Sequence, residues 1–67
     1  MPTIRLTAVE SHTPEQLRAF MEGATKLAMQ TLGAQEEGVI VHVELLPATL
    51  YMRGGKTIAQ RRGNDTP

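Results

Sequence analysis

The sequence of 67 residues contains no cysteine and no tryptophan, and it has only one Phe and one Tyr. Without cysteine no disulfide can form, and cysteine-type zinc sites are excluded as well. The two histidines, His12 and His42, are too few and too isolated to form a metal cluster, so we expect neither a metal nor a cofactor. So few aromatic rings also disfavour a protein that stacks on the bases of nucleic acids.

The charges of the chain cancel, because seven Lys and Arg side chains are matched by seven Asp and Glu side chains. A neutral chain offers no basic surface for nucleic acid and no acidic run of the kind that is typical of disorder. No apolar run approaches the roughly 20 residues of a membrane span, and the N-terminus lacks the basic and apolar segments of a secretory signal. We therefore expect a cytoplasmic protein with no nucleic-acid or membrane partner.

A chain of this length forms one domain and buries only about 60% of the surface that it exposes when unfolded. Small domains compensate with disulfides, a metal or a partner subunit, and the first two are not expected here. Association of subunits is therefore predicted. We expect the domain to span residues 1–62 and to be followed by a flexible tail over residues 63–67, whose sequence GNDTP has nothing to bury.

Two segments in the first half of the chain have clear secondary-structure signals. Residues 3–9, TIRLTAV, alternate apolar and polar side chains and predict a strand. The segment TPEQ then begins with a helix N-cap, Thr13, and carries its capping-box partner, Gln16. Apolar residues recur at helical spacing until Gly33, a residue type that ends many helices, so a helix is predicted over residues 14–32.

The second half predicts a further strand and a hairpin. Residues 38–46, GVIVHVELL, are typical of a strand with apolar surroundings on both faces. The pair Gly54-Gly55 predicts a turn between two short arms, residues 50–53 and 56–58. The fold class is therefore α/β (α+β): a β-α-β unit with parallel strands, one long helix and a short C-terminal hairpin. Its open sheet edges and its uncovered sheet face predict assembly through sheet pairing.

The opening residues, MPTI, make proline the second residue. Within a chain the prolyl nitrogen cannot titrate, but removal of Met1 would give Pro2 a secondary amine that accepts and donates a proton. An apolar pocket disfavours the cationic form of such an amine and lowers its pKa toward the working pH, where a general base is most effective. The alternative is that Pro2 is a proline at a strand edge, where no N–H is needed.

The order of these features resembles the 4-oxalocrotonate tautomerase family. The resemblance covers residues 1–62 and rests on Met1-Pro2, on the segments TPEQ and TLGA that flank the helix, on the second strand V.V.VELLP, and on Tyr51 before the Gly pair. It implies a tautomerase/MIF-like fold, in which β-α-β subunits dimerise into a four-stranded sheet and commonly stack as a hexameric trimer of dimers. It also implies a cofactor-independent isomerase that moves a proton in an enol or 2-oxo acid, with Pro2 as general acid and base after Met1 removal.

The family binds its substrate with an Arg in the turn after the first strand, an Arg near the start of the second, and an aromatic residue before the Gly pair. The resemblance assigns Tyr51 to the aromatic position, His12 to the first Arg position and Ile40 to the second. His is charged only part of the time near neutral pH, and Ile donates no hydrogen bond, so a dicarboxylate is not expected to bind in the same way. Arg53 and Arg5 are the nearest candidates to replace the missing cations.

Ordinary structural roles remain open for these residues. The alternative for His12 is a turn residue beside the N-cap, for Tyr51 a packing residue, and for Arg53 and Arg5 solvated surface side chains. His42 is interpreted as a residue at a subunit contact and not as a site residue.

Three functions are consistent with the sequence. The first is the tautomerase just described, with a small 2-oxo acid or enol as its substrate and a homo-oligomer as its assembly. The second is an enzyme of the same fold in which cationic Pro2 acts as an acid, such as a hydratase, a dehalogenase or a decarboxylase. The third is a partner subunit of a hetero-oligomeric tautomerase, in which a related chain supplies the missing Arg residues.

Overall fold

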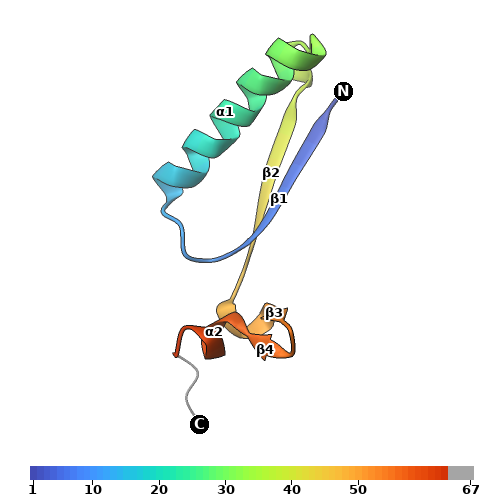
Figure 1. Cartoon of the computed structure of the whole chain (residues 1–67). Coiled ribbons are helices and arrows are strands. Elements are labelled where there is room, and N and C mark those ends of the chain that lie inside the picture. The colour runs from blue at the N-terminus through green and yellow to red at the C-terminus, as the bar shows by residue number, and fades with distance from the viewer. Residues whose placement is uncertain (64–67) are drawn as a thin grey trace.

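The computed structural model describes residues 1–63, which form a β-α-β unit followed by a small C-terminal unit, residues 47–63 (Figure 1). The first part consists of β1 (Thr3–Val9), α1 (Pro14–Leu32), the 3-10 helix η1 (Glu36–Gly38) and β2 (Ile40–Leu46). The C-terminal unit consists of the 3-10 helix η2 (Ala48–Leu50), β3 (Met52–Arg53), β4 (Lys56–Thr57) and α2 (Ile58–Arg61). The predicted mixed fold with one long helix is confirmed.

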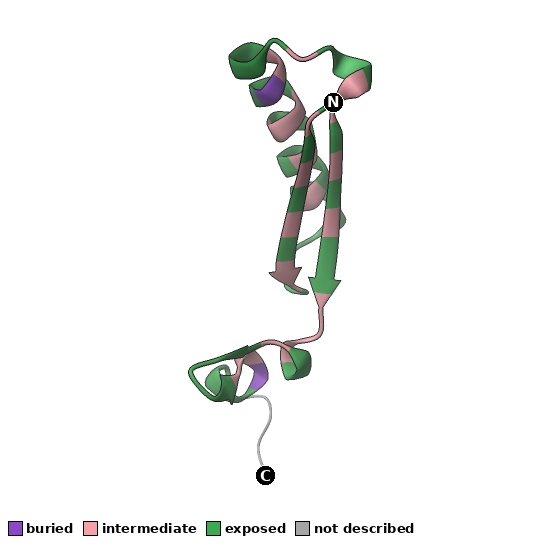
Figure 2. Ribbon diagram, turned by 90° about the vertical axis from the view of Figure 1, so that its right-hand side faces the viewer, coloured by how far each residue is buried: buried purple, intermediate pink, exposed green. Residues whose placement is uncertain are grey.

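Strands β1 and β2 pair in parallel, as the helical connection between them predicts. The register runs from Thr3 opposite Ile40 to Val9 opposite Leu46. Along both strands exposed and half-buried residues alternate, which is visible as bands of two colours in Figure 2. Helix α1 packs mainly over β2, so one face of the sheet is covered and the other faces away from the rest of the chain.

The start of α1 is a complete capping box, as predicted. The Gln16 backbone N–H donates to Thr13 Oγ1 at 3.1 Å, and the Thr13 backbone N–H donates to Gln16 Oε1 at 3.0 Å. Pro14 occupies the first turn, where its missing N–H costs nothing. At the other end Gly33 adopts the left-handed conformation with φ of 68°, so the helix ends where the sequence predicts.

Replacing Thr13 with alanine tests this cap. The variant loses the acceptor for the Gln16 N–H, so we expect its free energy of unfolding to fall by about 1 kcal/mol. Urea unfolding at a fixed protein concentration measures the change, because association also contributes to the stability of an oligomer. Ser11→Ala is the control: it removes an exposed hydroxyl whose hydrogen bond to the Val9 carbonyl is long, at 3.4 Å, and it should unfold nearly like the parent chain. Equal losses in both variants would contradict the assignment.

The second strand begins later than predicted. The expected strand over residues 38–46 is wrong at its start, because Glu36–Gly38 forms η1 and the strand begins at Ile40. The Gly38 N–H donates to the Gln35 carbonyl at 2.9 Å and the Val39 N–H to the Glu36 carbonyl at 3.2 Å. These donors bond within the tight turn and are therefore not available to the sheet.

The hairpin turn is confirmed, but its arms are shorter than predicted. Gly54 and Gly55 adopt φ of 62° and 82°, the positive values that a tight hairpin turn of the I′ type requires. The expected arms, residues 50–53 and 56–58, are wrong at their outer ends, where η2 and α2 take over. The second arm stops at Thr57 because this residue caps α2, with its Oγ1 accepting the Gln60 N–H at 3.1 Å.

Very little of the single chain is buried. Within residues 1–63 the buried residues are Ala28 and Ala59, and no large side chain is fully enclosed. The expectation that the second strand is covered on both faces is therefore wrong for one chain, since Ile40, His42 and Glu44 are exposed. Large apolar side chains also remain exposed at Met1, Phe20, Leu27, Leu32, Ile40, Leu45, Leu50 and Met52. Exposed apolar side chains in this number are typical of a surface that another subunit covers.

The predicted tail, residues 63–67, lies for the most part outside the described residues. Gly63 is described, and its N–H donates to the Gln60 carbonyl at 3.0 Å, which closes a turn at the end of α2. Residues 64–67 are outside the described part of the chain. Among residues 1–63 no helix has both the length and the apolarity to cross a membrane.

Candidate functional site

Pro2 and Ile40 are neighbours at one end of the sheet. The Ile40 N–H donates to the Pro2 carbonyl at 3.0 Å, which extends the β1–β2 ladder by one bond. Pro2 is half-buried, and Ile40 is 44% exposed. With Met1 attached, the Pro2 nitrogen belongs to a peptide bond, but the Met1 side chain is 90% exposed, so its removal would cost little packing. A freed amine at Pro2 would lie at the start of β1, next to the backbone of Ile40.

The charges near this end are negative. Glu36 and Glu37 lie in η1, directly before β2, and the last turn of α1 at the same end contains no basic residue. The C-terminus of a helix carries partial negative charge, which adds to the effect of the two carboxylates. Within a single chain this environment disfavours a substrate carboxylate.

His12 lies at the opposite end of the sheet from Pro2. It follows β1 in the exposed turn before the N-cap of α1. A seven-residue strand separates the two positions, which corresponds to roughly 20 Å at 3.3 Å per residue. One chain therefore does not bring His12 to Pro2.

Tyr51 and Arg53 lie still farther from Pro2, in the C-terminal unit beyond the end of β2 (Figure 1). The molecule is 50 Å long, and its N-terminus and the C-terminal unit lie toward opposite ends. Tyr51 is half-buried, and its carbonyl accepts the Ile58 N–H at 2.8 Å. Arg53 is exposed at the end of β3. The structure thus brings Pro2 together with Ile40 but separates both from the other three predicted site residues.

The C-terminal unit is strongly cationic. Residues 45–62 contain four basic side chains, Arg53, Lys56, Arg61 and Arg62, and no Asp or Glu. All four are exposed. Clustered positive charge attracts anions, so this unit is the part of the described chain best suited to a carboxylate. Arg5, the other cation considered, is exposed on β1 opposite His42 and lies away from the unit.

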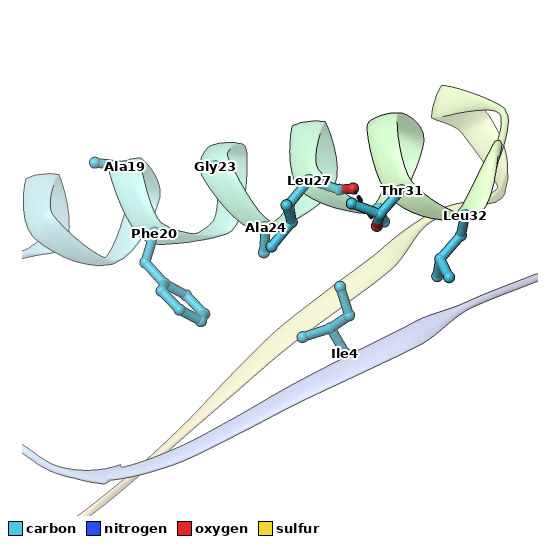
Figure 3. Close-up of a pocket in the computed structure, with 9 residues that line it drawn as sticks. Ile4, Ala19, Phe20, Gly23, Ala24, Leu27, Thr31 and Leu32 are labelled. Atoms are coloured by element: carbon cyan, nitrogen blue, oxygen red, sulfur yellow. Dashed lines mark hydrogen bonds between the residues drawn. The ribbon is translucent and has the colours of Figure 1, made fainter.

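An apolar groove of about 540 Å³ runs between α1 and β1. Phe20 and Leu32 point from α1 toward the strands, and Ile4 points from β1 toward α1 (Figure 3). The lining of the groove includes Gly23, which has no side chain, and Ala24, whose side chain is small, and both leave room over β1. Because α1 packs mainly over β2, the groove opens at the β1 edge of the sheet. It contains no chemical group suited to catalysis and has the character of a packing surface.

Arg61 is a residue of this region that the sequence analysis did not single out. Its guanidinium donates to the Arg53 carbonyl, with Nη2 at 2.8 Å and Nε at 3.3 Å. The sequence contains only a weak signal for a role of Arg61, namely that it is a basic residue in a chain segment without acidic residues. Among residues 1–63 there is no group of three or more His, Asp or Glu side chains arranged to hold a metal ion.

The comparisons with known proteins agree with this fold. A family model described as "Tautomerase enzyme" matches residues 2–61. A probable tautomerase of Bacillus cereus is 33% identical over 61 residues, which is 91% of this chain and all of the relative. The 2-hydroxymuconate tautomerase of Bacillus subtilis is 32% identical over 59 residues, 88% of this chain and 95% of the relative.

A solved structure extends the comparison to three dimensions. TomN, a 4-oxalocrotonate tautomerase homologue in the tomaymycin biosynthetic pathway, superimposes with a TM-score of 0.88 at 37% identity, covering 97% of this chain and all of that one. The residues that the family model matches, 2–61, include Pro2 and nearly all of the C-terminal unit. The chain therefore belongs to the tautomerase family, within its 4-oxalocrotonate tautomerase group, and is a tautomerase-type isomerase.

Proposed function

We propose that the protein moves a proton within a small enol or 2-oxo acid, using Pro2, freed by removal of Met1, as the proton carrier. The observation that carries the proposal is a half-buried prolyl residue at the start of an edge strand, whose carbonyl accepts the backbone N–H of Ile40. The free amine takes the proton from the enol oxygen and returns it to carbon, so the substrate is isomerised and the enzyme is unchanged. The stiff ring keeps the lone pair in one direction, which limits the entropy lost on reaction.

We propose further that the site is completed between copies of the chain. The β1 edge is open, and the apolar groove opens at the same edge. Two copies that pair their β1 edges about a two-fold axis perpendicular to the sheet have antiparallel β1 strands, with both α1 helices on one face. Each α1 then covers the groove of the other. The same symmetry brings the end of one β1, followed by His12, toward the start of the other, preceded by Pro2.

In this assembly the substrate's carboxylate is bound by Arg53 and Tyr51 of another copy, which lie in its cationic C-terminal unit. Arg53 provides the charge, and the Tyr51 hydroxyl is available as a hydrogen-bond donor. Ile40 lines the part of the site next to Pro2 and accepts an apolar portion of the substrate. Because Glu36 and Glu37 lie at this end, a second carboxylate here would be repelled. We therefore propose a substrate with one carboxylate, and a hexamer built from such dimers.

Two alternatives keep the same fold. A hetero-oligomer is favoured by the residues at positions 12 and 40, His and Ile, neither of which carries a permanent charge. Native mass spectrometry of the assembly purified from its source distinguishes the cases, because two subunit masses would favour the hetero-oligomer. Acid catalysis by cationic Pro2 is distinguished by the pH profile, since a base requires the free amine and an acid requires the protonated one.

The test of the proposed function uses a pair of 2-hydroxydienoates that differ only in whether they carry one or two carboxylates. We expect the protein to convert the monocarboxylate enol to its ketone with the higher kcat/KM of the two. In D₂O, NMR should show deuterium on the carbon that accepts the proton. A rate of ketonisation equal to that of buffer for both compounds would contradict the proposed function, and a preference for the dicarboxylate would contradict the role given to Ile40.

A further inference from the structure

The end of β3 is held by a side chain from α2. The guanidinium of Arg61 donates two N–H groups to one acceptor, the Arg53 carbonyl, at 2.8 and 3.3 Å. Two residues earlier, the Tyr51 carbonyl accepts the Ile58 backbone N–H at 2.8 Å. The segment from Tyr51 to Arg53 is therefore tied to α2 at both of its ends.

The position of Arg61 follows from the local sequence. Thr57 and Gln60 form a capping box, with the Thr57 N–H donating to Gln60 Oε1 at 2.7 Å and the Gln60 N–H donating to Thr57 Oγ1 at 3.1 Å. This box starts α2 directly after β4, without a loop. Arg61 consequently occupies the last turn of the short helix and reaches back across the hairpin to β3.

The guanidinium lies close against the turn itself. A Cβ on Gly54 would be 3.0 Å from Arg61 Nη2, whereas a Cβ on Gly55 would have nothing within 4 Å. Arg61 thus covers one side of the turn and leaves the other side open. In the C-terminal unit the one buried residue among those described is Ala59, so hydrogen bonds contribute much of what holds the hairpin in shape.

From these contacts we infer that Arg61 is a positioning residue, which fixes Tyr51 and Arg53 for the substrate without touching the substrate itself. The inference rests on the proposed function, because it concerns the two residues that bind the carboxylate there. A lysine at this position would keep the positive charge near the C-terminus of α2 but would lose the planar pair of donors. The alternative, a charge that merely stabilises the helix end, therefore predicts no difference between Arg and Lys.

The experiment compares three variants of the full chain: Arg61→Gln, Arg61→Lys, and the control Arg62→Gln. The control removes the same charge one residue later, from an exposed side chain. Tyr51 is the only tyrosine and tryptophan is absent, so intrinsic fluorescence reports on this segment alone. We expect lower Tyr51 fluorescence anisotropy in Arg61→Gln, an intermediate value in Arg61→Lys, and the parent value in Arg62→Gln, all at the same oligomeric state.

The kinetic readout separates positioning from a loss of folded protein. We expect Arg61→Gln to raise KM about tenfold with kcat nearly unchanged, well below the ~100-fold effect of a 1 Å misplacement of reacting groups. The kcat pH profile should be unchanged, because Pro2 is not affected. Partial unfolding would instead lower kcat at constant KM.

The possible outcomes lead to different conclusions. The inference would be overturned if Arg61→Gln had the anisotropy of the parent chain. It would also be overturned if Arg61→Lys had the same anisotropy and KM as the parent chain. Lower anisotropy with an unchanged KM would verify the contact from Arg61, but it would overturn the positioning role. If the parent protein has no activity toward either enol, the proposed function is contradicted, whatever the fluorescence of the variants.

Discussion

A chain with one leucine inserted between Met1 and Pro2 is expected to lose about 10²- to 10⁴-fold in kcat/KM, the usual contribution of a general acid or base. Enzymes that remove the initiator methionine accept a small second residue and reject a large one, so this variant keeps Met1. Pro2 is still present, but its nitrogen remains in a peptide bond and cannot carry a proton. Steady-state assay of ketonisation measures the loss.

Two controls separate the missing amine from other effects of the insertion. Met1 is 90% exposed in a single chain, so the insertion disturbs no packing within the subunit, and the variant should show the parent's circular dichroism and oligomeric mass. Pro2→Ala allows Met1 removal and keeps a primary amine without the ring, and its loss should therefore be smaller. Full activity in the inserted chain would show that the amine is not the proton carrier.

Replacing Leu27 with glutamate is expected to dissociate the assembly and, with it, abolish turnover. Leu27 lines the groove and is 59% exposed in a single chain. Full burial of such a side chain contributes about 1.5–3 kcal/mol, and a carboxylate left without a partner in a dry interface costs more. Because a symmetric dimer contains the change twice, we expect the dissociation constant to rise by at least about 10³-fold, which corresponds to roughly 4 kcal/mol.

Analytical ultracentrifugation and activity over a range of protein concentrations measure this effect. Lys26→Gln is the matched control, since it changes the net charge by the same one unit from the neighbouring exposed position outside the groove. It should associate and turn over like the parent chain. An assembled and active Leu27→Glu protein would contradict the assignment of the groove to a subunit contact.

The sequence predicts the secondary structure best where a local side-chain interaction decides it. Both ends of α1 follow from Thr13, Gln16 and Gly33, and the alternation over residues 3–9 gives β1. The start of β2 is not predictable in this way. It is set by the backbone N–H groups of Gly38 and Val39, which bond within η1 and not to the sheet, and no side-chain interaction marks this choice. The beginning of α2 was predictable, since Thr57 and Gln60 repeat the spacing of Thr13 and Gln16.

The site is less predictable than the fold for a physical reason. Parallel pairing alone makes Pro2 and Ile40 neighbours, because both lie at the same end of adjacent strands. In the proposed assembly, the distances from Pro2 to His12, Tyr51 and Arg53 would depend on how copies associate, which no local pattern encodes. The contact from Arg61 to Arg53 requires α2 to start immediately after β4, so it becomes visible only when the short helix is known.

The intact mass of the catalytically active assembly, measured after denaturation, tests the central claim most directly. If the secondary amine of Pro2 transfers the proton, every active subunit must have the mass of the chain without Met1. Active protein whose subunits all retain Met1 would contradict the account, because their prolyl nitrogen has no proton to exchange.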